Sequence, residues 1–204
     1  DQTHIYDMDA IVNPPEGYGK QLVEWMGMHR QAIMPEGDIF DFREITKDVW
    51  TKEVLLYSDI DVTFLNTLGF NEIFGGKDLF PTEACVELVK QINEETPGRV
   101  MTLGTIEPNQ PGHIEKLERY FREVGMTGLK LYPWDATKTG GWWADDEKLA
   151  YPIWEKCIEL GIKNIHIHKG LPATWTQVKY VHPSDMDGPI RDFPQLNFVV
   201  YHSG

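Results

Sequence analysis

The sequence predicts an α/β protein with parallel strands and intervening helices, and it favours a (β/α) barrel over an open sheet. From residue 60 onward, short apolar runs alternate with amphipathic segments of helical length, as in repeated strand and helix units. An open sheet more often has a glycine-rich phosphate turn after its first strand, and no GxGxxG or P-loop pattern occurs in this chain. We therefore expect a barrel, as one domain over residues 1–204.

The predicted elements form an ordered series along the chain. Strands are expected over residues 61–65, 99–105, 127–132, 163–168 and 196–202. Helices are expected between them over residues 82–95, 111–124 and 146–160. Pro97-Gly98 ends the first helix, Pro111 begins the second, and Gly125 and Gly161 are expected to end the second and third. A long connection, 171–195, precedes the last strand.

The first sixty residues have weaker patterns. Short helices are expected over residues 21–29 and 43–56, with a loop over 34–41. No internal repeat and no low-complexity linker interrupts the chain, so the sequence indicates no domain boundary.

Composition limits the partners that we expect. The chain has 32 acidic and 19 basic residues, a formal net charge of -13, which repels nucleic acid and anionic membranes. We therefore expect a small-molecule substrate, no nucleic acid and no membrane, with a homodimer left open. The start of the chain lacks a signal-peptide pattern, so we expect a cytoplasmic protein, although a leader before Asp1 would escape this test. Cys85 and Cys157 are expected to be reduced core thiols.

Two predicted strands end in histidine. The run 163–168 ends at His168 and the run 196–202 ends at His202, and His166 shares a strand face with His168. The carboxyl ends of parallel strands carry the chemistry in barrels, and neutral imidazoles there bind divalent ions or act as bases. The alternative is that each is a hydrogen-bonded core histidine, which we prefer for His166.

Three segments resemble one protein family. The strings GLKLYP (128–133), LGIKNIHIHKGLP (160–172) and DFPQLNFVVYHSG (192–204) look like the amidohydrolase-related family of the metal-dependent hydrolase superfamily. The resemblance begins near residue 49 and is specific in its HKG and YHSG motifs. It implies a distorted TIM barrel whose members include hydrolases and nonoxidative decarboxylases, with zinc or a related ion at the barrel mouth.

The resemblance assigns metal ligands and a catalytic residue. His168 matches the ligand at the end of strand five, and His202 matches the strand-six histidine, which ligates or acts as the base. The family's first strand ends in Asp-x-His-x-His, and the start of this chain, Asp1-Gln2-Thr3-His4, places Gln2 at the first histidine position and His4 at the second. Glutamine is a weak, neutral ligand, so this departure leaves the coordination open, and His4 could also be a terminal residue with no such role.

Substrate contacts are expected from four residues. Lys130 corresponds to a position where some superfamily members use a carboxylated lysine, and we assign it to substrate contact or an internal ion pair. Tyr132 and Trp142, together with the neighbouring Trp143, would line an aromatic pocket, with core or surface packing as the equal alternative. Arg30 could reach a substrate carboxylate through a bidentate guanidinium, although an exposed helix face is the simpler interpretation. Asp185 receives no functional assignment.

These assignments predict a metal-dependent hydrolase that acts on an amide, ester or lactone of a small molecule. The ion is expected to be zinc, with manganese or another divalent ion as alternatives. A nonoxidative decarboxylase of an aromatic or unsaturated acid is the first alternative function. A catalytically silent barrel that binds a ligand or partner is the second, and Gln2 at a ligand position is its best support.

The chain has fewer strands than a complete barrel. A TIM barrel typically takes roughly 250 residues, and this chain supplies about six of eight strand candidates, without the aspartate that ends strand eight in the family. Two sheet edges would stay exposed. We therefore expect a fragment that is poorly stable and inactive when isolated.

Overall fold

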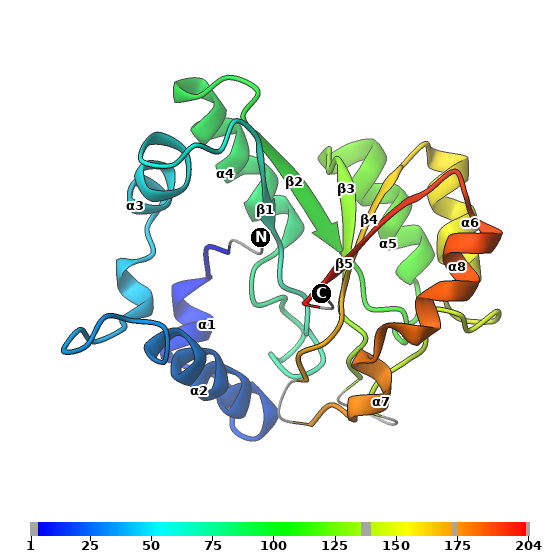
Figure 1. The fold of residues 1–204 in the computed structure, drawn as a ribbon, viewed down its shortest axis with the longest axis horizontal. Coiled ribbons are helices and arrows are strands. Elements are labelled where there is room, and N and C mark those ends of the chain that lie inside the picture. Colours follow the sequence, from blue (N-terminus) through cyan, green and yellow to red (C-terminus); the bar gives the residue numbers. More distant parts are fainter. Residues whose placement is uncertain (1–3, 136–139, 173–174, 203–204) are drawn as a thin grey trace.

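The computed structural model describes residues 4–135, 140–172 and 175–202. Its strands are β1 (Thr63–Asn66), β2 (Val100–Thr105), β3 (Gly128–Leu131), β4 (Asn164–His168) and β5 (Asn197–Tyr201). They form one parallel sheet in the order β1-β2-β3-β4-β5, which curls like part of a barrel wall (Figure 1). The predicted fold class, an incomplete (β/α) barrel, is confirmed, and each strand lies within two residues of its expected bounds.

The helices between the strands agree with the sequence pattern in two of three cases. Helix α4 (Thr82–Glu95) has the expected bounds, and α5 (His113–Arg119) continues into the π-helical turn η3 (Tyr120–Val124) and ends at Gly125 in the left-handed conformation. Helix α6 (Tyr151–Leu160) begins later than expected. The Asp146 carboxylate accepts hydrogen bonds from the Lys148 and Leu149 amides, and this stabilises turns in place of the expected first helical turn.

The amino-terminal segment forms short helices beside the sheet. They are α1 (Met8–Val12), α2 (Tyr18–Gln31), the 3-10 helix η1 (Phe42–Glu44), α3 (Lys47–Thr51) and the π-helical turn η2 (Lys52–Leu56). Helix α2 is longer than the expected 21–29, and α1 was not predicted; the Asp7 carboxylate caps it by accepting from the Asp9 amide at 2.9 Å. Figure 1 shows α1, α2 and α3 on the side of β1 that is away from β2.

The connection between β4 and β5 contains three short helices rather than one long loop. They are α7 (Val178–Val181), the 3-10 helix η4 (Pro183–Met186) and α8 (Asp187–Asp192). Among the described residues, no helix has the length and apolar character needed to cross a membrane.

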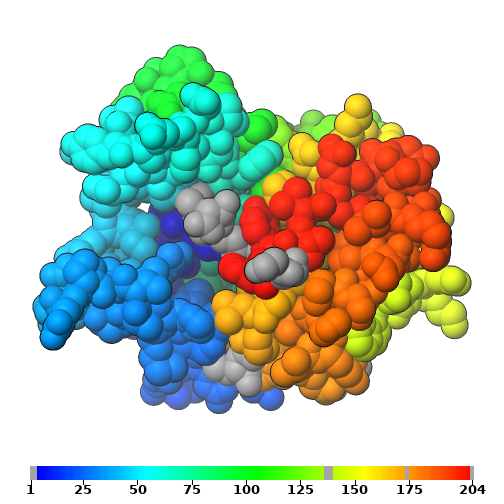
Figure 2. All heavy atoms as spheres, in the orientation of Figure 1, coloured from blue at the N-terminus to red at the C-terminus, as the bar shows by residue number. Residues whose placement is uncertain are grey.

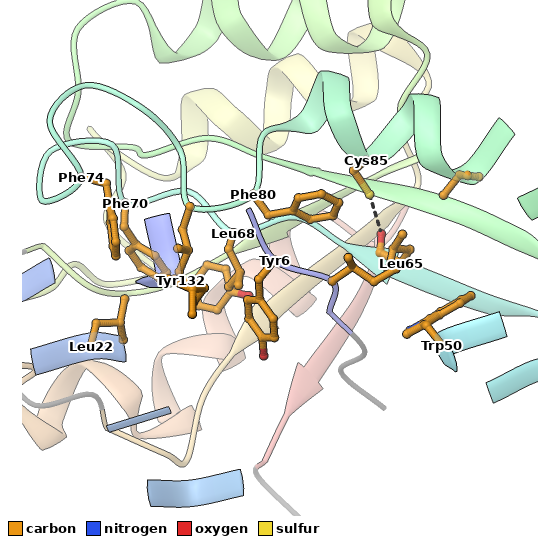
Figure 3. Packing of buried hydrophobic residues seen from close by; sticks show 14 of the residues in the cluster. Tyr6, Leu22, Trp50, Leu65, Leu68, Phe70, Phe74, Phe80, Cys85 and Tyr132 are labelled. Atoms are coloured by element: carbon orange, nitrogen blue, oxygen red, sulfur yellow. Dashed lines mark hydrogen bonds between the residues drawn. The ribbon is translucent and has the colours of Figure 1, made fainter. Parts of the chain in front are cut away.

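The buried side chains form two clusters. One joins α1, α2, α4 and the segment after β1, and Figure 3 shows its members Tyr6, Leu22, Leu68 and Phe70 together. The other packs α5 and α6 against β3 and β4, with Trp154 fully buried. Cys85 and Cys157 are buried free thiols, as expected, and Cys85 donates to the Leu65 carbonyl in Figure 3.

The two ends of the sheet are open in the described part of the chain. Strands β1 and β5 each pair with one neighbour, whereas β3 is buried along its whole length. No residue of β5 is fully buried, and Figure 2 shows the end of this strand at the surface. Of the expected first strand, residues 1–3 lie outside the described residues, and His4, which follows them, belongs to no strand.

Candidate active site at the carboxyl ends of the strands

A cavity of about 300 Å³ opens where the strands end. Its polar lining consists of histidines and one arginine: His4, His29, Arg30, His168 and His202. Its aromatic lining comes from Tyr6, Trp25, Phe70, Tyr132 and Trp134. The described part of the chain therefore brings five of the eight residues predicted for the site, His4, Arg30, Tyr132, His168 and His202, to one cavity.

His168 and His202 lie beside each other at the ends of neighbouring strands. Their ring centroids are 4.8 Å apart, with the rings inclined at 59°. Strand β4 delivers His168, and His202 follows β5 in the left-handed conformation, with a φ of 57°. Nε2 of His168 donates to the Leu171 carbonyl at 2.7 Å, so the neutral ring carries its proton on Nε2 and a lone pair on Nδ1.

His4 is buried although it precedes the first helix. Its Nδ1 donates to the backbone carbonyl of Asn66, the last residue of β1, at 3.1 Å. The other ring nitrogen, Nε2, therefore has the lone pair in the neutral form. This contact brings the start of the chain to the same end of the sheet as His168.

All three histidines favour the neutral form. Burial lowers the pKa of His4 to about 3, against the opposing hydrogen bond to Asn66. Burial also lowers the pKa of His168 well below its ordinary value, with Lys130 as the next cause. The pKa of His202 is lowered by partial desolvation and then by Lys130. Neutral imidazoles are the form that binds metal ions or accepts protons.

Lys130 lies below the cavity, inside the barrel. Its side chain is fully buried, and its Nζ lies 4.2 Å from the Tyr132 ring centre and 4.6 Å from that of Tyr201. Nζ donates to the Leu131 carbonyl at 3.3 Å, and the described residues provide no carboxylate for the internal ion pair that we considered. Burial lowers the pKa of Lys130 well below its ordinary value.

His166 lies one layer deeper than His168, as its strand position predicts. Its Nδ1 is 2.9 Å from the Tyr201 hydroxyl, and its ring packs against Phe64 at 4.9 Å between centroids. The expectation of a hydrogen-bonded core histidine is confirmed.

Two aromatic side chains in the cavity wall carry unsatisfied polar atoms. Phe70 and Trp134 are stacked, with centroids 5.3 Å apart and 17° between the planes, and Tyr132 lies 5.2 Å from Trp134. Both Tyr132 and Trp134 are at least nine-tenths buried, yet the Tyr132 hydroxyl and the Trp134 indole nitrogen have no hydrogen-bond partner among the described residues. A buried donor without a partner is costly, which points to a ligand or water as the partner.

Arg30 and His29 come from the last turn of α2 and complete the cavity rim. Arg30 is half-buried and has no ion-pair partner within the described ranges. A guanidinium in that state suits an anionic group of a ligand.

Trp142 and Gln2 do not join the described cavity lining. Trp142 is buried in the cluster around α6 and supports the wall from behind, since its indole nitrogen donates to the Tyr132 carbonyl at 2.9 Å. Gln2 lies outside the described residues. Trp25, Phe70 and Trp134 were not predicted to line the site, although Trp134 directly follows the GLKLYP string.

The loop that carries Phe70 is closed by backbone hydrogen bonds at its base and packs against Glu107. The Leu68 and Phe80 amides and carbonyls pair across its base, and Phe70 has a φ of 73°. Glu107 packs against Gly69, and both of its carboxyl oxygens are buried. Burial raises the pKa of Glu107 to about 8, with Glu72 and Asp78 adding to the shift. The carboxyl group is therefore mostly protonated at neutral pH.

The donor chemistry of the cavity fits a divalent transition metal, but the described donors form only part of a ligand set. His4 and His168 each have one ring nitrogen held by a backbone carbonyl, which is how metal-binding histidines are oriented. In the described ranges, no three His, Cys, Asp or Glu side chains are grouped closely enough to hold an ion. Further donors would have to come from elsewhere.

Comparison with known proteins identifies the family. The sequence profile of the amidohydrolase family matches residues 53–204, well over half of the chain. The chain belongs to the amidohydrolase family. The amidohydrolase match includes His168 and His202, whereas His4 and Arg30 precede it. No curated protein matches the sequence.

Solved structures share the amidohydrolase barrel at low sequence identity. An uncharacterised TIM-barrel protein from Bordetella bronchiseptica matches with a TM-score of 0.62 and 16% identity, over 90% of this chain and 59% of its own. 4-Oxalomesaconate hydratase from Rhodopseudomonas palustris matches at 0.51 and 19%, over 98% and 61%. An amidohydrolase from Mycobacterium avium subsp. paratuberculosis matches at 0.51 and 14%, over 87% and 56%. The chain thus spans less than two thirds of these structures, and the likeness concerns the fold.

Proposed function

We propose that this protein is a metal-dependent hydrolase that acts on a small carboxylated amide, ester or lactone. The observation that carries the proposal is the convergence of His4, His168 and His202 on one cavity with aromatic walls. His4 and His168 would hold the ion, zinc in the first instance, together with Gln2 or other donors outside the described residues. When bound, a divalent ion there supplies polarisation of a carbonyl group and of a water molecule.

The chain's own side chains have distinct tasks in this proposal. His202 is exposed at the mouth of the cavity beside His168, so it accepts a proton from the attacking water and returns it to the leaving group. Arg30 binds the substrate carboxylate from the rim. The Tyr132 hydroxyl, which has no hydrogen-bond partner in the described part of the chain, donates a hydrogen bond to the substrate, and the Phe70 and Trp134 rings exclude water. Lys130 places positive charge below the substrate whenever it is protonated.

Decarboxylation of an aromatic acid is the second candidate, and the stacked Phe70 and Trp134 pair favours it. Flat aromatic walls suit a planar ring, and Arg30 would orient its carboxylate. His202 would first take up a proton from solvent and then transfer it to the ring carbon from which carbon dioxide departs, which returns His202 to its neutral form.

Turnover assays separate these candidates. The protein would be incubated with panels of esters, lactones, amides and aromatic acids, with and without a chelator, and then with zinc or manganese added back. Chelator-sensitive hydrolysis supports the first candidate, and chelator-sensitive release of carbon dioxide supports the second. A protein that turns over neither class but binds an aromatic acid at the cavity would instead be a silent barrel.

A further inference from the structure

A buried ion pair lies directly behind His168. Lys169 and Asp185 have side-chain exposures of 0% and 2%, and Nζ is 2.6 Å from Oδ2. Burying two charges costs several kcal/mol of desolvation, so such a pair often contributes little net stability, and apolar replacements can be neutral. The role of the Lys169–Asp185 pair therefore lies in the parts of the structure that it holds in place.

The pair joins three segments of the chain. Nζ of Lys169 also donates to the Tyr180 carbonyl in α7 at 2.9 Å. Oδ2 of Asp185, in η4, also accepts from the Ala144 amide at 2.7 Å. The charged contact thus joins three segments: the end of β4, the segment with α7 and η4, and the chain before α6.

The turn after β4 depends on the same segments. The Gly170 amide donates to the Val181 carbonyl at 2.6 Å, and the Leu171 amide donates to the Lys169 carbonyl at 2.8 Å. These bonds place the Leu171 carbonyl where it accepts from Nε2 of His168 at 2.7 Å. The position of the Leu171 carbonyl, and with it the tautomer of His168, therefore follows from how the turn is anchored on α7.

The other side of the pair supports the aromatic wall. Ala144, held by Asp185, is two residues from Trp142, whose amide donates to the Pro133 carbonyl at 3.0 Å and whose indole donates to the Tyr132 carbonyl. Both His168 and Tyr132 are thus held through segments that meet at the pair.

We propose that Lys169 and Asp185 are positioning residues that keep His168 in the Nε2–H tautomer, with its lone pair on Nδ1, by anchoring the Leu171 carbonyl. The relevance of this tautomer to metal binding rests on the proposed function. The tautomer itself can be measured without metal or substrate.

The test uses long-range proton and nitrogen-15 NMR correlations of the histidine rings at neutral pH, with His168 assigned from His168→Gln. The wild type should show His168 as a single Nε2–H tautomer. Asp185→Asn and the double variant Lys169→Met with Asp185→Leu should show a mixture of tautomers. Arg191→Met, which breaks the exposed pair with Asp192, is the matched control and should leave the His168 signals unchanged.

Folding is checked by circular dichroism and thermal melting, and the apolar double variant is included because it leaves no unpaired buried charge. A folded double variant that keeps the single Nε2–H tautomer would overturn the proposal, as would a wild type with mixed tautomers. If neither variant folds, the pair is required for the fold itself and the positioning role is also overturned.

Zinc titration then connects the tautomer to the site. The folded variants should bind zinc about 10–100-fold more weakly than the wild type, as for other lost supports of metal ligands. A wild type that binds no zinc contradicts the proposed function but leaves the tautomer result standing, so the two failures are distinguishable.

Discussion

Gly170 and His202 are in direct backbone contact, and this contact brings the two strand-end histidines together. Gly170 has a φ of 74°, and a Cβ built on it would overlap the carbonyl oxygen of His202. The glycine of the HKG motif therefore permits the close approach of the ends of β4 and β5. The 4.8 Å separation of the His168 and His202 rings depends on that approach.

Gly170→Ala should destabilise the protein by about 2–5 kcal/mol, since the left-handed conformation costs a non-glycine residue about 1–2 kcal/mol and overpacking costs about 1–3 kcal/mol. Urea denaturation measures the loss. Gly161→Ala is the matched control: its φ is 80°, but no atom of the described residues lies within 4 Å of the added Cβ, so only the conformational cost applies. Equal losses in the two variants would contradict the contact with His202.

His202→Asn should retain bound zinc and lose turnover by about 100- to 10,000-fold, the range for removal of a general acid or base. His168→Asn should lose the metal as well, because His168 is assigned as a ligand. Metal content by atomic absorption and kcat for the best substrate of the panel distinguish the two roles. Loss of metal in His202→Asn would show that His202 is a metal ligand and would contradict its assignment as the base.

Arg30→Gln should raise KM for carboxylated substrates by about 10–100-fold with little change in kcat, because a hydrogen bond to a charged group contributes about 1.5–3 kcal/mol. Steady-state kinetics with matched carboxylated and neutral esters measures the effect, and the neutral ester should be unaffected. Lys20→Gln, on the same helix but paired with Glu16 at the surface, is the control. An equal rise in KM for both esters would exclude recognition of the carboxylate.

Glu107→Gln should stabilise the protein at pH 8–9. The folded-state pKa is raised to about 8 from an ordinary value of 4.5, so the carboxyl group contributes stability below pH 4.5 that is lost as the pH rises through 8. The pKa shift of Glu107 corresponds to a loss of about 3–5 kcal/mol in the free energy of unfolding across this pH range. Glutamine removes this dependence because it does not ionise.

Urea denaturation between pH 5 and 9 tests the Glu107 prediction. The wild type should lose stability across this range, and Glu107→Gln should flatten that part of the profile. Glu87→Gln, at an exposed position of α4, should keep the wild-type slope. An unchanged slope in Glu107→Gln would show that Glu107 ionises normally in the folded protein.

Much of the barrel was accessible from local sequence patterns. The short apolar runs predicted the strands, and the helical periodicity of residues 82–95 predicted α4. Both patterns are local, because the residues that an element buries recur at short, regular intervals along the chain. Gly125 and Gly161 ended their helices as predicted, because their left-handed conformation is a local requirement. The placement of His168 and His202 at strand ends followed from the same patterns.

Local sequence patterns did not predict the structure where the same residues are compatible with more than one arrangement. The Asp146 carboxylate supports either a helix cap or the turns that replace the first turn of the helix expected over 146–160, and packing decided for the turns. Trp142 and Trp134 are equally aromatic, yet one supports the wall from behind and the other lines the cavity. Composition alone does not distinguish these positions.

The sequence by itself determined the class of fold, the order of strands and helices, and the two histidines that end neighbouring strands, because each depends on residues close together in the chain. Only the tertiary structure decided which side chains share the cavity, since Arg30, His4 and Trp134 come from distant segments. It also revealed the pairing of Lys169 with Asp185, to which the sequence had assigned no role. Such contacts depend on three-dimensional packing, which spacing along the chain does not specify.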